Sequence, residues 1–193
     1  MTKNSFFSVE EFTERRQRFF ALLPANSVAI FAANSEVTRS NDTEYPFCQN
    51  KNFYYLTGFN EPDALLVLVK GNTNEHQQSV LFCREKDPLQ EVWHGRRLGY
   101  EQALTTLAVD LSFPISEIDI KLPEYLNHKA QVLYCFSDQH LLSKVPTWLA
   151  KVNAGNRTGQ KAPTSKVDCS AIINELRLIK THAELRVMRQ VNV

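Results

Sequence analysis

A polar segment from Thr38 to Pro46, TRSNDTEYP, carries the first side chains that could do chemistry. It follows a continuous apolar run, and α/β folds often place recognition groups in the loops that follow strands. The segment is rich in side chains that can form hydrogen bonds. From composition alone, the simpler interpretation of this segment is a solvated connection.

A second segment, from Glu91 to Gly99, combines an aromatic ring with arginines and glycines in the string EVWHGRRLG. Tryptophan and arginine are frequent anchors of protein interfaces. Trp93 could therefore be an exposed contact, or it could fill a gap in the core, and the residues alone support both interpretations equally. We expect Asp87 to Gly99 to form a long loop.

Motifs of well-known catalytic chemistry are absent from the sequence. It contains no phosphate-binding glycine loop, no HExxH zinc motif and no GxSxG nucleophile elbow. The histidines lie far from one another, which favours surface positions for all of them: His76, His94, His128, His140 and His182. The sequence therefore predicts a chain without a catalytic or metal-binding site of its own.

The charge and the cysteine content indicate which partners and which cellular compartment the sequence favours. The formal net charge is +1 over 193 residues, so no general attraction to nucleic acid or to acidic membranes is predicted. The basic residues Arg15, Arg16 and Arg18 are expected on a solvated helix face. The 4 cysteines include no CxxC pair, and Cys83 and Cys135 lie in apolar runs, where a thiol usually packs as a small hydrophobe.

The first residues contain no long apolar run before a cleavage signal, so a secretory signal is not expected. No stretch approaches the roughly 18 apolar residues of a membrane span. A reduced, cytoplasmic protein is the simplest interpretation of these features.

Apolar runs predict the strands that must position the two segments. Strand-length runs that suggest burial occur at Val28–Ala33, Ala64–Val69, Val80–Cys83 and Gln131–Phe136. The aromatic run Phe53–Leu56 is a further strand candidate. Gly71–Asn74 predicts a hairpin and hence an antiparallel pair, so the sheet should be mixed.

Helical patterns alternate with these runs. Ser8 and Glu11 form a predicted capping box for the first helix, which should end before Pro24. Further helices are expected at 100–107, 117–126, 137–151 and from 168 or 170 to 179. Pro146 should kink or restart the helix that contains it. Strands that alternate with helices indicate a layered α/β domain.

Thr181 and Glu184 make another predicted capping box, and an amphipathic pattern then runs to the end of the sequence. Because this pattern is incomplete, we expect polypeptide beyond residue 193. We place the folded domain at 1–175, and we interpret 176–193 as a linker and the start of a further domain.

Three stretches resemble the amino-terminal domain of bacterial aminopeptidase P, a Xaa-Pro aminopeptidase. They are EVTRSNDTEYPFCQNKNFYYLTGFNEPDALLVL, SVLFCREKDPLQEVWHGRRLG and INELRLIKTHAELRVMRQ. The resemblance runs in order from about Phe12 to the last residue. Prolidases and creatinases share the fold and the linker pattern, but they differ in the loops that carry TGFNEPDA and VWHGRRLG.

The resemblance implies a non-catalytic domain of the creatinase/prolidase superfamily. Such a domain is a three-layer α/β sandwich of ribonuclease-H-like topology, with a mixed, roughly six-stranded sheet flanked by helices. The resemblance also implies a following pita-bread metallopeptidase domain, in which Asp, Asp, His, Glu and Glu hold two divalent metal ions, usually manganese. None of those ligands matches a position here, so the chain alone should bind no catalytic metal and hydrolyse nothing.

The same resemblance implies roles for three residues at a substrate cleft. Asp42 and Arg157 match members of a polar network. Trp93 matches an aromatic lid that is contributed across a subunit interface and excludes water, although His94 replaces an expected aromatic residue beside it. The implied partners are the chain's own catalytic domain, neighbouring subunits of a homo-oligomer and a proline-containing peptide.

Two other functions stay open. The chain could be a peptide-binding or protein-binding module of a family member that has lost catalysis, which the downstream metal ligands would decide. It could also belong to a small-molecule hydrolase of the creatinase type, and the VWHGRRLG loop argues against this by resemblance.

Overall fold

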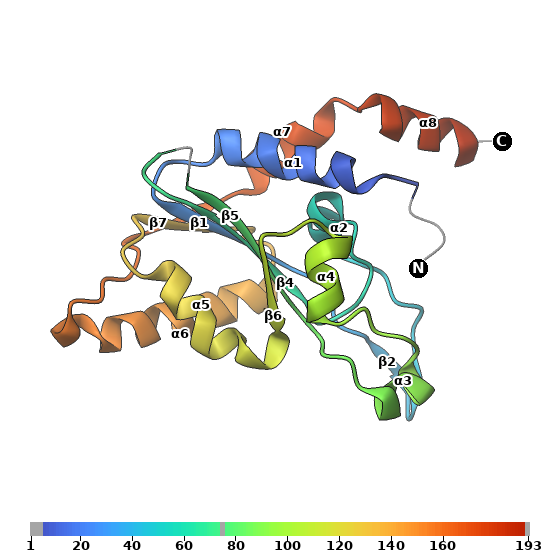
Figure 1. Ribbon diagram of the computed structural model, residues 1–193, viewed down its shortest axis with the longest axis horizontal. Helices are drawn as coiled ribbons and strands as arrows, with labels where there is room; N and C mark the ends of the chain where they lie inside the picture. Colours follow the sequence, from blue (N-terminus) through green and yellow to red (C-terminus); the bar gives the residue numbers. More distant parts are fainter. Residues whose placement is uncertain (1–5, 74–75, 192–193) are drawn as a thin grey trace.

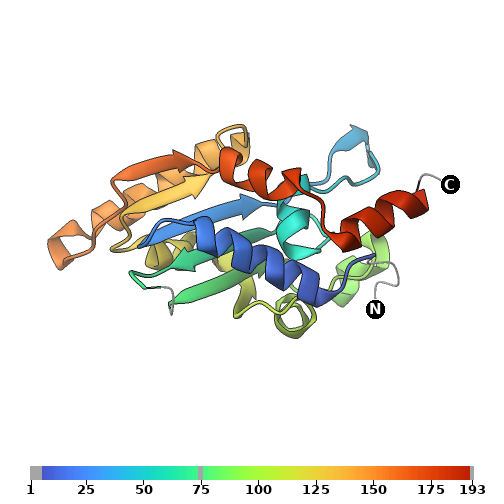
Figure 2. The ribbon, with the colours of Figure 1, turned by 90° about the horizontal axis from the view of Figure 1, so that it is seen from above.

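The computed structural model describes residues 6–73 and 76–191. The main strands are β1 (Ser27–Ala32), β4 (Leu65–Lys70), β5 (Gln77–Cys83), β6 (Leu111–Pro114), β7 (Gln131–Tyr134) and β8 (Ser165–Asp168). They form one six-stranded sheet in the order β6-β5-β4-β1-β7-β8. Helices cover both faces of this sheet, so the predicted three-layer α/β architecture is confirmed (Figures 1 and 2).

Strand β1 is the centre of a mixed sheet. It pairs antiparallel with β4, and β4 pairs antiparallel with β5. On its other side β1 pairs parallel with β7, which pairs parallel with β8. This arrangement confirms the mixed sheet and fits the ribonuclease-H-like topology that the resemblance implies. The antiparallel pairing of β4 with β5 confirms the pair that the predicted hairpin implies, while residue 74 of the predicted turn lies outside the described residues.

The helices divide the core into two layers. One face of the sheet carries α1 (Val9–Leu22), α2 (Lys51–Thr57), α4 (Tyr100–Thr106) and α7 (Ser170–Leu178), and the other carries α5 (Ile118–Leu126) and α6 (Gln139–Ala154). Alternate residues of β1 serve the two layers, Ala29 and Phe31 on the first face and Val28 and Ile30 on the second. Every residue of β1 is therefore buried, as its continuous apolar run predicts.

The shorter elements lie outside these layers. They are the small hairpin of β2 (Thr38–Ser40) and β3 (Thr43–Glu44), the helices α3 (Pro88–His94) and α8 (His182–Val191), and two 3-10 turns, η1 (Ile115–Glu117) and η2 (Asn156–Thr158). None of the helices in the described ranges is long and apolar enough to cross a membrane.

The run Phe53–Leu56, predicted as a strand, is instead part of helix α2. The side chain of Asn50 caps this helix by accepting hydrogen bonds from the amides of Asn52 (3.0 Å) and Phe53 (3.2 Å). Gly58 ends it in the left-handed conformation, with φ at +66°. These local caps outweigh the strand preference of the aromatic residues.

The long loop predicted from Asp87 to Gly99 also contains a helix, α3. The side chain of Asp87 accepts hydrogen bonds from the amides of Leu89 (3.0 Å) and Gln90 (3.1 Å). Pro88 occupies the first turn, where its missing N–H costs nothing. The prediction of a loop was wrong because it passed over this Asp-Pro start signal.

The two predicted capping boxes have different outcomes. Thr181 and Glu184 exchange side-chain and backbone hydrogen bonds of 2.8 and 3.2 Å, which confirms the second box. At the first, the Ser8 side chain makes no cap hydrogen bond. Glu11 instead pairs with Arg15 at 3.2 Å, so the prediction of a box there was wrong.

Helix α6 is capped by Asp138 rather than by Ser137, because Asp138 accepts the amide of Leu141 at 3.1 Å. It continues through Pro146 as one helix, so the alternative of a restart at that proline is not seen. The predicted helix is confirmed from Gln139 to Lys151, and α6 extends it to Ala154.

The prediction of a solvated basic face on α1 was wrong for two of its three arginines. Arg15 and Arg16 are each only 2% exposed. The Arg16 guanidinium donates to the carbonyl oxygens of Leu56 (3.0 Å), Leu107 (3.1 Å) and Ala108 (2.6 Å). These bonds join α1 to the ends of α2 and α4, and they replace the hydration that a buried charge loses.

Candidate functional site

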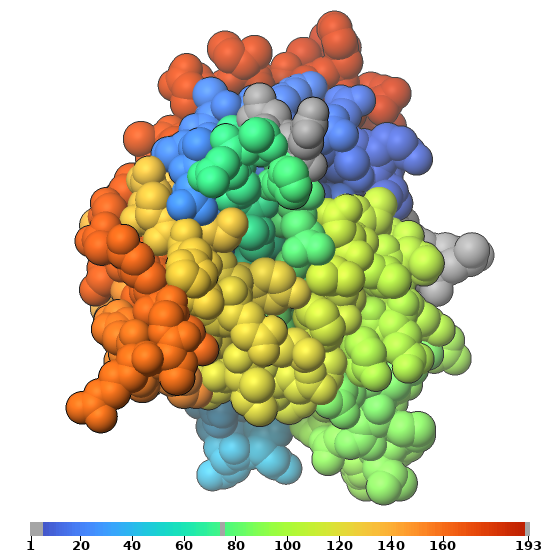
Figure 3. Space-filling view, turned by 60° about the vertical axis from the view of Figure 1, so that its left-hand side comes forward, coloured from blue at the N-terminus to red at the C-terminus, as the bar shows by residue number. Residues whose placement is uncertain are grey.

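Two of the three predicted site residues lie in segments at the same end of the molecule. Asp42 lies in the turn between β2 and β3, and Trp93 lies in the last turn of α3. Figure 1 shows both segments at the lower right, and Figure 3 shows the hairpin in blue and α3 in green as two projections from the lower edge. Asp42 is exposed to solvent there.

Trp93 is 84% exposed, which excludes the alternative of a core residue. Leu89 and Val92 on the same helix are also exposed, and no residue of α3 is buried. We refer to Leu89, Val92 and Trp93 as the α3 patch. Large apolar side chains gathered on one short exposed element are typical of a surface that contacts another protein.

A partly buried carboxylate holds the α3 segment to the body of the domain. Glu61 accepts the amide hydrogen of Leu98 at 2.8 Å and forms an ion pair with Arg84 at 3.9 Å. Burial raises the pKa of Glu61, while the Leu98 amide and the guanidinium of Arg84 act in the opposite direction. The segment that carries the α3 patch is therefore attached to the domain at Leu98.

Arg157 lies in a different part of the molecule. It belongs to the η2 turn that follows α6, and its side chain is exposed. Figures 1 and 2 both place this turn, in dark orange, at the opposite end from β2 and α3. A single copy of the chain does not bring Arg157 together with Asp42 and Trp93.

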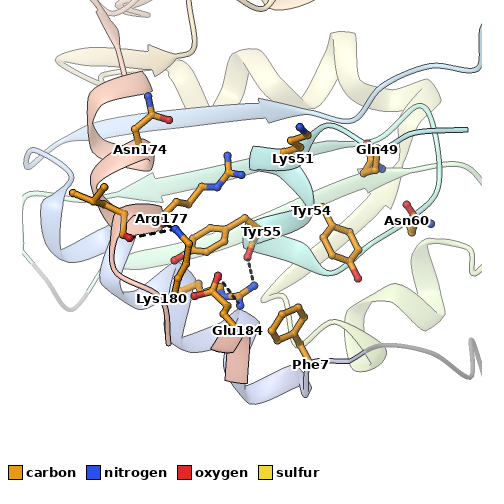
Figure 4. Close-up of a pocket in the computed structure, with 12 residues that line it drawn as sticks. Phe7, Gln49, Lys51, Tyr54, Tyr55, Asn60, Asn174, Arg177, Lys180 and Glu184 are labelled. Carbon is orange, nitrogen blue, oxygen red and sulfur yellow. Dashed lines mark hydrogen bonds and ion pairs between the residues drawn. The ribbon is translucent and has the colours of Figure 1, made fainter. Parts of the chain in front are cut away.

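A cavity of about 700 Å³ lies where α1, α2, α7 and α8 meet (Figure 4). The guanidinium carbon of Arg15 lies 4.4 Å from the ring centre of Tyr55 and 4.6 Å from that of Phe7. Arg15 also pairs with Glu184 at 3.4 Å. The cavity could not be predicted from the sequence, because its walls come from three separate segments, around residues 7–15, 49–60 and 174–184.

Several polar groups around the cavity are already hydrogen-bonded to the surrounding protein. Arg177 donates to the Asn52 side chain at 2.5 Å, and the Tyr55 hydroxyl donates to the Leu176 carbonyl at 3.1 Å. Burial raises the pKa of Tyr55, and the nearby Glu184 adds to this effect. Among the described residues that line the cavity there is no Ser, Thr, Cys or His, so it offers none of these side chains as a nucleophile.

The described residues also fail to provide a metal centre. In the ranges 6–73 and 76–191, no three His, Cys, Asp or Glu side chains come together so that they could hold a metal ion. The five histidines are all exposed, as predicted. The donor set of a dinuclear metallopeptidase is thus not found in the part of the chain that the structure describes.

Comparison with known families assigns the class of this domain. The model for the amino-terminal domain of aminopeptidase P matches residues 12–134. Since this is more than half of the sequence, the chain belongs to the family of aminopeptidase P amino-terminal domains.

Bacterial enzymes are among the relatives of this chain. The chain is 40% identical over 191 residues to the Xaa-Pro aminopeptidase of Escherichia coli, which covers 96% of this chain and 42% of the relative. It is 38% identical over 184 residues to the Xaa-Pro aminopeptidase of Haemophilus influenzae, covering 94% and 39%. The chain therefore spans about two fifths of the length of these relatives.

Solved structures support the same assignment. Aminopeptidase P from E. coli in its low-pH form superposes with a TM-score of 0.92 at 39% identity, over 96% of this chain and 42% of that one. Proline aminopeptidase P II from Yersinia pestis gives a TM-score of 0.91 at 40% identity, over 95% and 42%. These matches confirm the predicted family and fold.

Proposed function

We propose that this chain is the non-catalytic, assembly and substrate-gating domain of a manganese-dependent Xaa-Pro aminopeptidase. The observation that carries the proposal is the match to the amino-terminal domain of aminopeptidase P, in a chain whose described residues lack a metal-ligand cluster. Residues 1–175 would form the domain, and 176–193 would lead into a metallopeptidase domain. The assembled enzyme would be a cytoplasmic homo-oligomer.

Related aminopeptidase P structures support the chemistry proposed for the assembled enzyme. One E. coli aminopeptidase P structure contains the inhibitor Pro-Leu, and another is zinc-substituted and holds a product. We infer that the full protein removes the residue before a proline, with two divalent ions held in the metallopeptidase domain. In that division of labour this chain contributes no metal ligand.

The α3 patch supports the proposed role in assembly. Three large apolar side chains stay in contact with water in the isolated chain, and burying them against a neighbouring subunit would remove that contact. Trp93 would then close over the cleft of the neighbour and exclude water from the bound peptide.

Asp42 and Arg157 are proposed as polar groups of the same cleft. Asp42 is suited to pairing with a guanidinium, and Arg157 can bind a carboxylate with two parallel hydrogen bonds. The two residues lie at opposite ends of one copy of the chain. Both can reach the same cleft only if they come from different subunits or if the catalytic domain extends between them. This requirement fits a homo-oligomer.

The proposal is tested in the full-length gene product with manganese and a Xaa-Pro peptide. Trp93→Ala should lower kcat/KM by roughly tenfold and weaken self-association, since exposed aromatic anchors carry much of the binding energy of an interface. Ile120→Ala is the matched control, because Ile120 is an exposed apolar residue of α5 outside the patch, and its variant should behave as wild type.

Two outcomes would refute parts of this account. Equal kcat/KM and equal mass in solution for the Trp93→Ala and wild-type proteins would remove the gating role. A full-length protein that binds Xaa-Pro peptides without cleaving them would indicate a binding module instead of an enzyme.

A further inference from the structure

Two cysteines far apart in the sequence lie side by side in the core. Cys135 follows the last residue of β7, and Cys169 lies between β8 and α7. Their sulfur atoms are 3.7 Å apart, although 34 positions separate them along the chain. Cys135 is 7% exposed and Cys169 is fully buried.

The strand register accounts for this contact and makes a covalent link possible. Tyr134 and Asp168 are partners in the parallel pairing of β7 with β8, so the residues that follow them leave adjacent strands together. Neighbouring strands lie about 4.8 Å apart, within the roughly 4.4–6.8 Å between Cα atoms that disulfides span. A small approach of the two sulfur atoms would therefore bring them to bonding distance.

The two thiols differ in acidity. Hydrogen bonds from Cys169, Ser170 and Asn52 lower the pKa of Cys135 to about 7, against the effect of burial. The same bond to Cys135, together with burial, raises the pKa of Cys169. A Cys135 thiolate supported in this way is the form that reacts with oxidants. Cys83 is a contrast within the same core, because burial raises its pKa to about 12.

We propose that Cys135 and Cys169 form a reversible disulfide when the protein meets a hydroperoxide. The Cys135 thiolate attacks the terminal peroxide oxygen, so that a sulfur–oxygen bond forms, the oxygen–oxygen bond breaks, and hydroxide leaves from hydrogen peroxide or an alkoxide from an organic hydroperoxide. The Cys169 sulfur then attacks the Cys135 sulfur. The sulfur–sulfur bond forms, and the sulfur-bound hydroxyl leaves with the Cys169 proton as water.

In this reaction the two sulfurs give up two electrons and the peroxide oxygens accept them. A dithiol reductant reverses the bond by exchange. A small hydroperoxide suits the site, because the reactive sulfur is almost covered by protein.

The disulfide would fix the start of α7 to the end of β7. Helix α7 also carries Arg177, which binds Asn52, and Asn52 in turn donates to the Cys135 sulfur at 3.7 Å. Oxidation would add to these hydrogen bonds a covalent link between the start of α7 and the sheet. Helix α7 also forms one wall of the cavity that Arg15 lines, and the disulfide would make this wall harder to displace.

The test uses the chain with Cys48→Ser, because Cys48 is exposed and would otherwise react first. After treatment with hydrogen peroxide, we expect a mass loss of about 2 Da and a linked Cys135–Cys169 peptide, both reversed by dithiothreitol. The midpoint of thermal unfolding should rise by roughly 5–10 °C in the oxidised form. Cys83 should stay unmodified at the same peroxide concentration.

A second variant tests the proposed order of the two steps. In Cys48→Ser with Cys169→Ser, Cys135 should stop at the sulfenic acid and no linked peptide should form. If that variant does not fold, the peptide map of the first protein decides alone. Thiols that stay reduced while an added exposed thiol oxidises, or Cys135 that passes to the sulfinic acid without a link, would overturn the proposal.

Discussion

Arg16 is the residue on which three elements of this domain converge. Its guanidinium donates to Leu56 in the last turn of α2, and to Leu107 and Ala108 just after α4. Carbonyl groups at helix ends have no partner within the helix, and they carry partial negative charge. A buried cation at this position therefore satisfies several acceptors at once.

Replacing Arg16 by alanine should destabilise the domain by about 3 kcal/mol, because it leaves buried carbonyl groups without donors and opens a gap in the core. Urea unfolding of the chain would measure the change. Arg18→Ala is the matched control, since the Arg18 side chain is 48% exposed and its loss should cost less than about 0.5 kcal/mol. Equal effects of the two substitutions would contradict the role of Arg16.

The sequence could not reveal the burial of Arg16. Its acceptors lie 40, 91 and 92 positions away, in segments that α1 meets only in the folded domain. Three basic residues within four positions are ordinarily a solvated helix face, and that general rule produced the wrong prediction. Trp93 was different. A tryptophan in a segment with glycines is compatible with an exposed interface contact, so this interpretation was already open from the sequence.

At the scale of elements, the end of α2 depends on Gly58. This residue has φ at +66°, and a Cβ atom there would overlap the ring of Phe12 in α1. The position thus needs glycine both for its backbone conformation and for the close approach of the two helices.

Gly58→Ala should lower the free energy of unfolding by about 2–3 kcal/mol, from backbone strain and from displacement of the Phe12 ring. Gly159→Ala is the matched control, because Gly159 has φ at +90° and nothing lies near its built Cβ atom. The control should show only the backbone cost, roughly 1 kcal/mol. Denaturant unfolding that gave equal losses for the two variants would show that the contact with Phe12 is unimportant.

The anchor of α3 should make stability depend on pH. Glu61 has a pKa raised above its ordinary value of 4.5, chiefly by burial. Above pH 4.5 the folded state therefore holds this proton more tightly than the unfolded chain does. The contribution of Glu61 to stability is complete below pH 4.5 and is lost as the pH rises through the folded pKa.

Glu61→Gln removes this titration and keeps an oxygen that can accept the Leu98 amide hydrogen. Between pH 4.5 and neutrality, the free energy of unfolding should therefore fall less steeply in the variant than in the wild type. Unfolding measured at several pH values would provide the comparison. Parallel curves, or a steeper fall in the variant, would show that Glu61 does not titrate as its burial requires.

The central strands could be predicted from the sequence, and the edge strands could not. Strands β1 and β4 are covered on both faces and carry continuous apolar runs, and β5 has a buried apolar run from Val80 to Cys83. No apolar run predicts β6 or β8, which are four residues each and lie at the two edges of the sheet. An edge strand has a neighbour on one side only and needs no continuous apolar run; β8 is mostly exposed.

At the scale of the whole molecule, the domain presents its proposed functional groups at opposite ends. The β2–β3 hairpin and the α3 patch lie at one end, and the η2 turn with Arg157 lies at the other. A domain that contributes to clefts at both ends is suited to an assembly of several copies. The family and fold were predictable because three long strings carry the resemblance, whereas the separation of Arg157 from Asp42 required the structure.

The division of labour between this domain and a metallopeptidase domain is tested most directly by peptide hydrolysis. The full-length gene product and the chain of residues 1–193 would be compared with a Xaa-Pro peptide, with manganese and after chelation. The account predicts cleavage by the full-length protein that chelation abolishes, and no cleavage by the chain alone in either condition. Cleavage by residues 1–193 alone, or a full-length protein that stays inactive with manganese, would contradict it.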